Sequence, residues 1–281
     1  MILYAVLILG GLGIIFGSGL ALAGKKFAVP VDPNQEKLLK VLPGINCGAC
    51  GMPGGCSGYA EALVKGGFAL DLCVVGGEET ARKIAEILGK EASIKEPAVA
   101  RVLCQGGNSE KKYEYSGIRD CYAAKLVSGG FKSCRYGCLL FGTCVEVCPF
   151  DAFDWREGDI PRVIDEKCRA CGKCVDACPV GIIKLIPRSV KVYVNCSSRD
   201  KGASVRKICK DGCFTCNICV KACPQKAITI EDNLPVIDRS KCNGCGICVE
   251  KCPSHAIKFM REGEGVGVMK DKTTLSAGAR V

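Results

Sequence analysis

The stretch CRACGKCVDACP, residues 168–179, decides the fold: four cysteines follow the spacing C-x2-C-x2-C-x3-C and a proline comes next. This spacing is typical of bacterial ferredoxin half-units, whose thiolates hold [4Fe–4S] clusters. The runs CFTCNICVKACP at 213–224 and CNGCGICVEKCP at 242–253 repeat it. Three intact runs with a closing proline indicate iron–sulfur ferredoxin units and argue against zinc ribbons.

A fourth run, CRYGCLLFGTCVEVCP at 134–149, is altered: Phe141 stands where the second cysteine belongs, and Cys134 precedes Cys138 by four residues. In a two-cluster ferredoxin the fourth cysteine of each run binds the cluster of the other run. The predicted sets are Cys168, Cys171, Cys174 with Cys148; Cys242, Cys245, Cys248 with Cys223; Cys213, Cys216, Cys219 with Cys252; and an incomplete set of Cys138, Cys144 and Cys178.

Five cysteines lie outside the ferredoxin spacing: Cys104, Cys121, Cys134, Cys196 and Cys209. Cys134 is nearest to the incomplete set, so we expect it to complete that set. The other four then form a sixth site between two duplicated segments, VLCQGG and VNCSSRDKG. The roles of Cys134 and Cys121 are exchangeable in this scheme. The alternative is that these residues are buried free thiols, which leaves five clusters.

A further cysteine set opens the chain's folded part. The stretch LPGINCGACGMPGGC at 42–56 and a later residue supply Cys47, Cys50, Cys56 and Cys73. Its glycines let the backbone wrap closely around a cluster. Apolar periodicity predicts helices over 58–67 and 78–90. A zinc ion is the alternative occupant of these four thiolates.

The composition excludes several classes of protein. The 281 residues include 24 cysteines and one histidine, with a formal charge of +10. Disulfide scaffolds are usually much shorter chains, and mixed Cys/His zinc sites need more histidine. Six clusters with four thiolates each add roughly −12, which takes the net charge to about −2. We therefore expect no nucleic-acid partner.

The first 24 residues, MILYAVLILGGLGIIFGSGLALAG, contain no charged side chain, and Lys25 and Lys26 follow. This length predicts one membrane-spanning helix. The positive-inside rule places the N-terminus outside and the cluster domains in the cytoplasm, with the chain in the inner (cytoplasmic) membrane. The alternative, a cleaved signal peptide, lacks a basic n-region and would export the cysteines to an oxidising space.

The chain resembles the B subunit of the Rnf complex over residues 1 to about 262. The resemblance rests on the uncharged N-terminal anchor, the LPGINCGACGMPGGC unit and the ferredoxin runs taken together. The resemblance implies a redox subunit of an ion-pumping ferredoxin:NAD+ oxidoreductase, transporting Na+ or H+. It further implies that reduced ferredoxin is the donor, and that electrons pass to membrane and cytoplasmic partner subunits. The chain departs from shorter family members by having two ferredoxin pairs. No NAD or flavin motif is found, so we expect no such site here.

Two other hypotheses compete with this one. The first is an anchored polyferredoxin of a hydrogenase or a heterodisulfide-type reductase, and the second is a structural zinc or disulfide protein. The expected fold class is α+β. The expected boundaries are an anchor at 1–24, a linker at 25–34, an α-rich [4Fe–4S] domain at 35–92, ferredoxin-like units at 93–190 and 191–262, and a flexible tail at 263–281.

Overall fold

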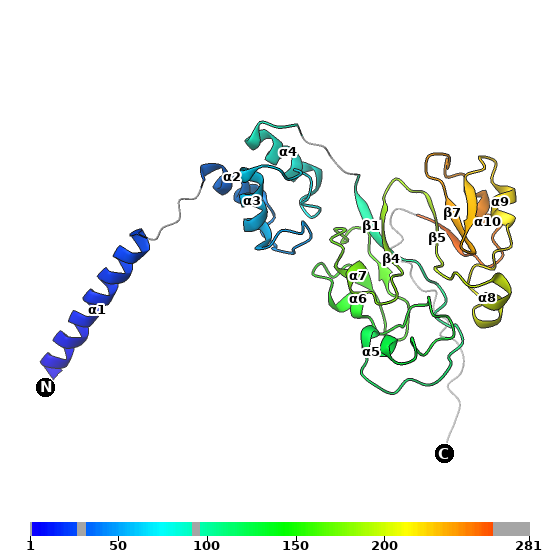
Figure 1. Cartoon of the computed structure of the whole chain (residues 1–281), viewed down its shortest axis with the longest axis horizontal. Coiled ribbons are helices and arrows are strands. Elements are labelled where there is room, and N and C mark those ends of the chain that lie inside the picture. The colour runs from blue at the N-terminus through cyan, green and yellow to red at the C-terminus, as the bar shows by residue number, and fades with distance from the viewer. Residues whose placement is uncertain (1, 27–31, 92–95, 261–281) are drawn as a thin grey trace, which may run out of the picture.

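A computed structural model describes residues 2–26, 32–91 and 96–260 of the chain. Figure 1 shows four parts in chain order: a long helix, a small helical unit and two β-containing halves. We call them helix α1, the N-terminal unit (32–91), the first half (96–190) and the second half (191–260). The expected tail at 263–281 lies outside the described residues.

Helix α1 runs from Ile2 to Lys26, 25 residues, and its last turn carries Lys25 and Lys26. It covers residues 2–24 of the segment expected to be the anchor and continues two residues beyond it. Over the described ranges of the chain, no helix qualifies by length and apolar character as one that crosses a membrane.

The N-terminal unit is built from three helices, α2 (Pro33–Val41), α3 (Gly55–Lys65) and α4 (Gly77–Leu88). Leu38, Leu63 and Ile84, one from each helix, are buried together in its core. The expected helices at 58–67 and 78–90 correspond to α3 and α4. Helix α2 begins at Pro33, two residues before the expected start of this domain at residue 35.

The first half contains two small antiparallel sheets and three short helices. Its elements are β1 (Ala98–Val102), α5 (Cys121–Leu126), α6 (Thr143–Glu146), β2 (Phe153–Asp154), β3 (Arg162–Val163), α7 (Lys173–Asp176) and β4 (Ile183–Pro187). Strand β1 pairs with β4, and β2 pairs with β3. Val99 and Ile183, on the paired strands β1 and β4, are at most 1% exposed and form the centre of the core.

The second half repeats this plan. Its elements are β5 (Val192–Val194), α8 (Gly202–Ile208), α9 (Ile218–Ala222), β6 (Ile228–Glu231), β7 (Leu234–Ile237), α10 (Ile247–Glu250) and β8 (Ile257–Phe259). Strand β5 pairs with β8, and β6 with β7, both antiparallel. In both halves a strand leads into the cysteine runs and pairs with the strand that follows the last run. The two halves therefore have the arrangement of a duplicated unit.

The two halves contact one another through loops that follow β1 and β5. The Gln105 amide Nε2 donates to the carbonyl oxygens of Asp211, Ser254 and His255, at 2.9, 3.1 and 3.0 Å. In the opposite direction, the Ser197 hydroxyl donates to the Leu103 carbonyl at 2.8 Å. These side chains satisfy backbone groups of the other half, so the junction is specific.

Candidate metal centres

Cysteines gather in sets of four around cavities of the two halves. All 24 cysteines fall within the described residues, and none of them forms a disulfide. Four cavities are lined by four cysteines each, and no cysteine lines more than one of them. A four-thiolate cavity is the arrangement that a cuboidal iron–sulfur cluster requires.

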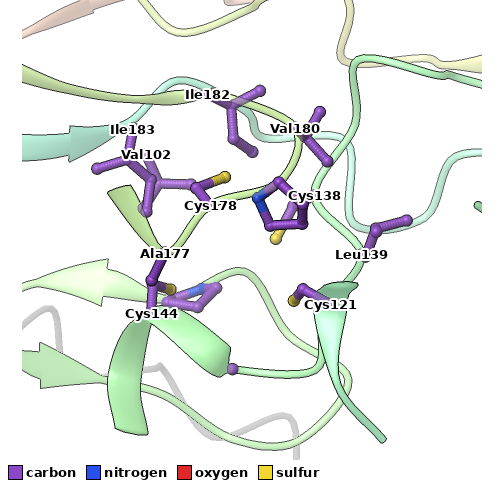
Figure 2. Close-up of a pocket in the computed structure, with 13 residues that line it drawn as sticks. Val102, Cys121, Cys138, Leu139, Cys144, Ala177, Cys178, Val180, Ile182 and Ile183 are labelled. Atoms are coloured by element: carbon purple, nitrogen blue, oxygen red, sulfur yellow. The ribbon is translucent and has the colours of Figure 1, made fainter. Parts of the chain in front are cut away.

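The first cavity, called the apolar cavity, is lined by Cys121, Cys138, Cys144 and Cys178. Figure 2 shows their sulfur atoms facing a common space, with Cys121 at the start of α5. The remaining lining residues are aliphatic residues, prolines and a glycine. A cluster here would therefore be surrounded by apolar groups.

Cys121, and not the expected Cys134, lies beside the other three cysteines of this set. This is the exchanged arrangement of the two residues that the sequence left open. Asp120 caps α5 by accepting a hydrogen bond from the Ala123 amide at 2.9 Å. The Thr143 hydroxyl donates to Asp120 Oδ2 and accepts from the Cys121 amide, both at 2.9 Å. Since Thr143 precedes Cys144, these bonds fix two members of the set relative to each other.

Phe141, which replaces the missing cysteine of the run, points into an aromatic cluster. Its ring centroid lies 5.4 Å from that of Tyr115 and 5.6 Å from that of Phe131. Rings at such distances and at tilted angles attract one another. The position that holds a ligand in an intact run therefore holds part of the core here.

The second cavity, called the bridging cavity, is lined by Cys104 and Cys134 of the first half and Cys196 and Cys209 of the second. A Cβ atom on Gly106 would lie 2.6 Å from the Cys209 sulfur, so this close approach requires glycine. The bridging cavity thus unites four of the five cysteines outside the ferredoxin spacing.

A buried hydroxyl without a partner supports a ligand in the bridging cavity. Among the described residues, the buried side-chain atoms that lack a hydrogen-bond partner are Ser109 Oγ and Asn195 Oδ1. Both residues line this cavity. Unpaired buried polar groups are costly and call for a missing partner. A cluster with its sulfurs fits the Ser109 hydroxyl, which is a hydrogen-bond donor.

The sequence contains a signal that assigns Cys134 to the bridging cavity, although its closeness in sequence to Cys138 favoured the other assignment. Cys209 precedes Cys213 by four residues, as Cys134 precedes Cys138. Aligning the two runs therefore makes Cys134 the counterpart of Cys209, and the structure places these two in the same cavity.

The third and fourth cavities unite the cysteines that the ferredoxin spacing puts together. The Cys168 cavity is lined by Cys148, Cys168, Cys171 and Cys174, and the Cys242 cavity by Cys223, Cys242, Cys245 and Cys248. The Ala100 amide donates to the Cys168 sulfur at 3.5 Å, and the Ala227 amide to the Cys223 sulfur at 3.4 Å. Such bonds stabilise a thiolate and its bound cluster.

The remaining eight cysteines form two sets that are recognised by their electrostatic influence on one another. Burial raises the pKa of Cys73, and Cys56, Cys47 and Cys50 raise it further. Burial likewise raises the pKa of Cys219, with added contributions from Cys216 and Cys252. We call these the N-terminal set (Cys47, Cys50, Cys56, Cys73) and the Cys213 set (Cys213, Cys216, Cys219, Cys252).

Each of the four cavities contains at least one thiol whose pKa is raised. Burial, followed by smaller contributions that include neighbouring thiols, raises the pKa of Cys138 and Cys174 to about 12 and that of Cys134 and Cys248 to about 11. Four buried thiols cannot all ionise at neutral pH without a compensating positive charge. An iron–sulfur core supplies that charge, so the donor sets fit [4Fe–4S] clusters.

A single metal ion needs its ligands closer together. In the part of the chain that the structure describes, no group of three or more His, Cys, Asp or Glu side chains is arranged to hold one metal ion. A cubane binds each cysteine through a different iron atom, which requires wider separation of the sulfurs than one ion does.

Four families of iron–sulfur domains match parts of the chain. The family described as "Putative Fe-S cluster" matches residues 42–75, and a "4Fe-4S dicluster domain" matches residues 133–183. Two families described as "4Fe-4S binding domain" match residues 210–226 and 235–258. The four cysteines expected to form a sixth site lie outside all four matches; they are Cys104, Cys121, Cys196 and Cys209. They do not share one cavity, because Cys121 lines the apolar cavity and the other three line the bridging cavity.

Three relatives are similar over most of the chain. The chain is 50% identical over 85% of its length to the B subunit of the Na(+)-translocating ferredoxin:NAD(+) oxidoreductase complex of Acetobacterium woodii, of which 72% is covered. It is 44% identical to the B subunit of the proton-translocating ferredoxin:NAD(+) oxidoreductase complex of Clostridium ljungdahlii, over 82% of the chain and 81% of the relative. It is 40% identical to the B subunit of the ion-translocating oxidoreductase complex of Methanosarcina acetivorans, over 86% and 92%.

Proposed function

Because the chain belongs to the family of B subunits of ion-translocating ferredoxin:NAD+ oxidoreductase complexes, we propose that it carries single electrons from reduced ferredoxin through six [4Fe–4S] clusters to partner subunits. The observation that carries this proposal is the gathering of sixteen cysteines into four four-cysteine cavities. When bound, such clusters act as one-electron carriers of low potential. The ligand sets, the number of clusters and the donor are parts of the proposal.

We infer that the six sets follow one another in a series. Burial is the main cause of each raised thiol pKa, and a thiol of the next set adds to it. The resulting order is the N-terminal set, the Cys168 cavity, the apolar cavity, the bridging cavity, the Cys213 set and the Cys242 cavity. The pairs of thiols that give this order are, from the first link to the last, Cys47–Cys171, Cys174–Cys144, Cys104–Cys138, Cys196–Cys213 and Cys219–Cys248. Electrostatic influence falls with distance, so these sets are neighbours.

The donor's docking place follows from exposure. Cys216 and Cys245, in the last two sets of the series, are the exposed cysteines of the chain. Lys221 and Lys251, which follow these cysteines by five and six residues in the sequence, are exposed as well. An acidic ferredoxin is attracted by such charges. We expect Lys221→Glu with Lys251→Glu to slow reduction by ferredoxin at low salt, in rapid-mixing experiments, whereas Lys184→Glu in the first half leaves the rate unchanged.

The anchor is a further part of the proposal. Helix α1 is 25 residues long, and its charged side chains, Lys25 and Lys26, lie in its last turn. We propose that it holds the chain in the cytoplasmic membrane with its N-terminus outside. An arginine near the helix centre costs about 2.5–3.5 kcal/mol in insertion assays. Ile14→Arg should release the protein from carbonate-washed membranes, while Ile118→Arg, at an exposed site in the first half, should not.

The number of clusters is tested by iron and acid-labile sulfide per chain, on anaerobically prepared protein. We expect about 24 iron atoms in the wild type and about 20 in Cys209→Ala. About 20 in both proteins would mean that the bridging cysteines are free thiols and that the series has five clusters. A colourless protein without iron would refute the relay itself.

A further inference from the structure

Lys132 is a buried cation beside the bridging cavity. It is 1% exposed, and it is the one buried lysine among the residues that the structure describes. Its Nζ donates to the carbonyl oxygens of Gly106 and Gly107, at 3.1 and 2.9 Å. Gly106 lines the bridging cavity. The Lys132 backbone is held in place by a β-bridge to Lys111.

The charge of Lys132 needs a partner of opposite sign, because an unpaired buried ion is strongly destabilising. Over the described residues, no Asp or Glu forms an ion pair with it. Lys132 stands two residues before Cys134, and its Nζ binds the Gly106 carbonyl oxygen. Cys134 and Gly106 both line the bridging cavity. The negative charge of a thiolate-bound cluster there is the counter-charge that the lysine lacks.

The bridging and apolar cavities are neighbours with opposite surroundings. The apolar cavity has no polar side chain in its lining apart from the cysteines. The bridging cavity is lined by Ser109, 7% exposed, whose hydroxyl has no partner. Asp211 also lines it, but this residue is partly exposed, so water screens its charge more than that of Lys132.

We propose that Lys132, assisted by the Ser109 hydroxyl, makes the cluster of the bridging cavity the first of the series to be reduced. The inference rests on the proposed function and adds a residue that sets where in the series an electron rests. The step is the one-electron reduction of [4Fe–4S]2+ to [4Fe–4S]+, with the electron coming from reduced ferredoxin and no bond formed or broken. Reduction takes the thiolate-bound cluster from about −2 to about −3, so a fixed cation and hydrogen-bond donors favour the reduced state.

The consequence is a step in potential at the junction of the two halves. With a cluster held by the four cysteines of the bridging cavity, an electron that enters through the second half would rest at the bridging site until a partner subunit draws it away through the first half. Because this site takes two cysteines from each half, it is the one place in the series that both halves share.

The order of reduction is tested first, on the anaerobic full-length protein in detergent. In a titration monitored by electron paramagnetic resonance, the signal absent from Cys209→Ala identifies the bridging cluster. We expect this signal to appear first in the wild type as the potential is lowered. Its appearance together with or after the other signals would overturn the inference. Iron counting is independent of this order, so a failure of the inference is distinguishable from a failure of the six-cluster proposal.

The role of Lys132 is tested with Lys132→Met, which removes the charge at similar length. We expect the one-electron reduction equilibrium of the bridging cluster to become at least tenfold less favourable, about 59 mV lower in potential. Ser109→Ala should shift it in the same direction by less. Lys132→Arg should keep the wild-type order, and the exposed Lys184→Met should shift nothing. An unchanged potential in a fully loaded Lys132→Met protein would refute the role of the lysine.

Discussion

The placement of Cys121 and Cys134 predicts how paired substitutions add. In the structure Cys134 shares the bridging cavity with Cys209, whereas Cys121 lines the apolar cavity. Two ligands of the same cluster are lost together, so Cys134→Ala with Cys209→Ala should remove one cluster, about four iron atoms. Cys121→Ala with Cys209→Ala should remove two clusters, about eight iron atoms.

The assay is iron and sulfide per chain, with electron paramagnetic resonance to count altered signals where a site keeps part of its iron. The single variants are the controls, because each should affect one cluster. The reverse pattern, a larger loss from Cys134→Ala with Cys209→Ala than from the Cys121 pair, would refute the placement. It would instead support the assignment in which Cys134 fills the gap at Phe141.

Three further predictions concern the scaffold. Gly58→Ala should cost the N-terminal set its cluster, about four iron atoms, because the new Cβ would lie 1.7 Å from the Pro53 carbonyl oxygen. Thr143→Val should lower the stability by about 1–3 kcal/mol, because the Cys121 amide and Asp120 lose the hydroxyl to which they are hydrogen-bonded. The cluster of the apolar cavity should then be lost at a lower temperature in absorbance melts. Arg101→Met should destabilise the first half by about 3–5 kcal/mol, measured as a lower guanidinium midpoint, because it leaves Asp165, 12% exposed, without its bidentate partner.

The intact ferredoxin runs could be read from the sequence because their ligands are local. Cys168, Cys171 and Cys174 lie within seven consecutive residues, and the Cys168 cavity holds them together with Cys148, as the exchange of fourth ligands predicts. The turn geometry is encoded there too, since Gly172 adopts a φ of 83° before α7. Where the ligand spacing is short, the backbone leaves few alternatives.

The ligand set of the altered run could not be predicted in this way, because the cysteine that replaces its missing second ligand comes from a distant segment. Cys134 is close in sequence, but the Gly137 amide donates to the Cys134 carbonyl at 3.1 Å and closes a tight turn. Its sulfur lines the bridging cavity, and a cysteine 23 residues before Cys144 completes the set. The capping bonds of Asp120 and Thr143 that fix Cys121 join segments whose contact no local pattern reveals.

Two other features escape a reading of the sequence for different reasons. Helix α2 has a clear start signal, since Asp32 caps it and Pro33 follows at its first position. The signal places the start of the helix two residues before the expected domain boundary at 35. Lys132 carries no signal at all, because lysines are usually exposed and only the folded chain shows this one to be buried.

The duplication explains why the bridging site exists. Cys104 follows β1 as Cys196 follows β5, and Cys134 precedes its run by the same four residues as Cys209. Each half thus contributes an equivalent pair of thiols that cannot hold a cluster alone. Joining the halves through Gln105 and Ser197 brings the two pairs to one cavity. A cluster bound there would depend on both halves being folded. In the proposed series the same four cysteines would then link the two halves and carry the electron between them.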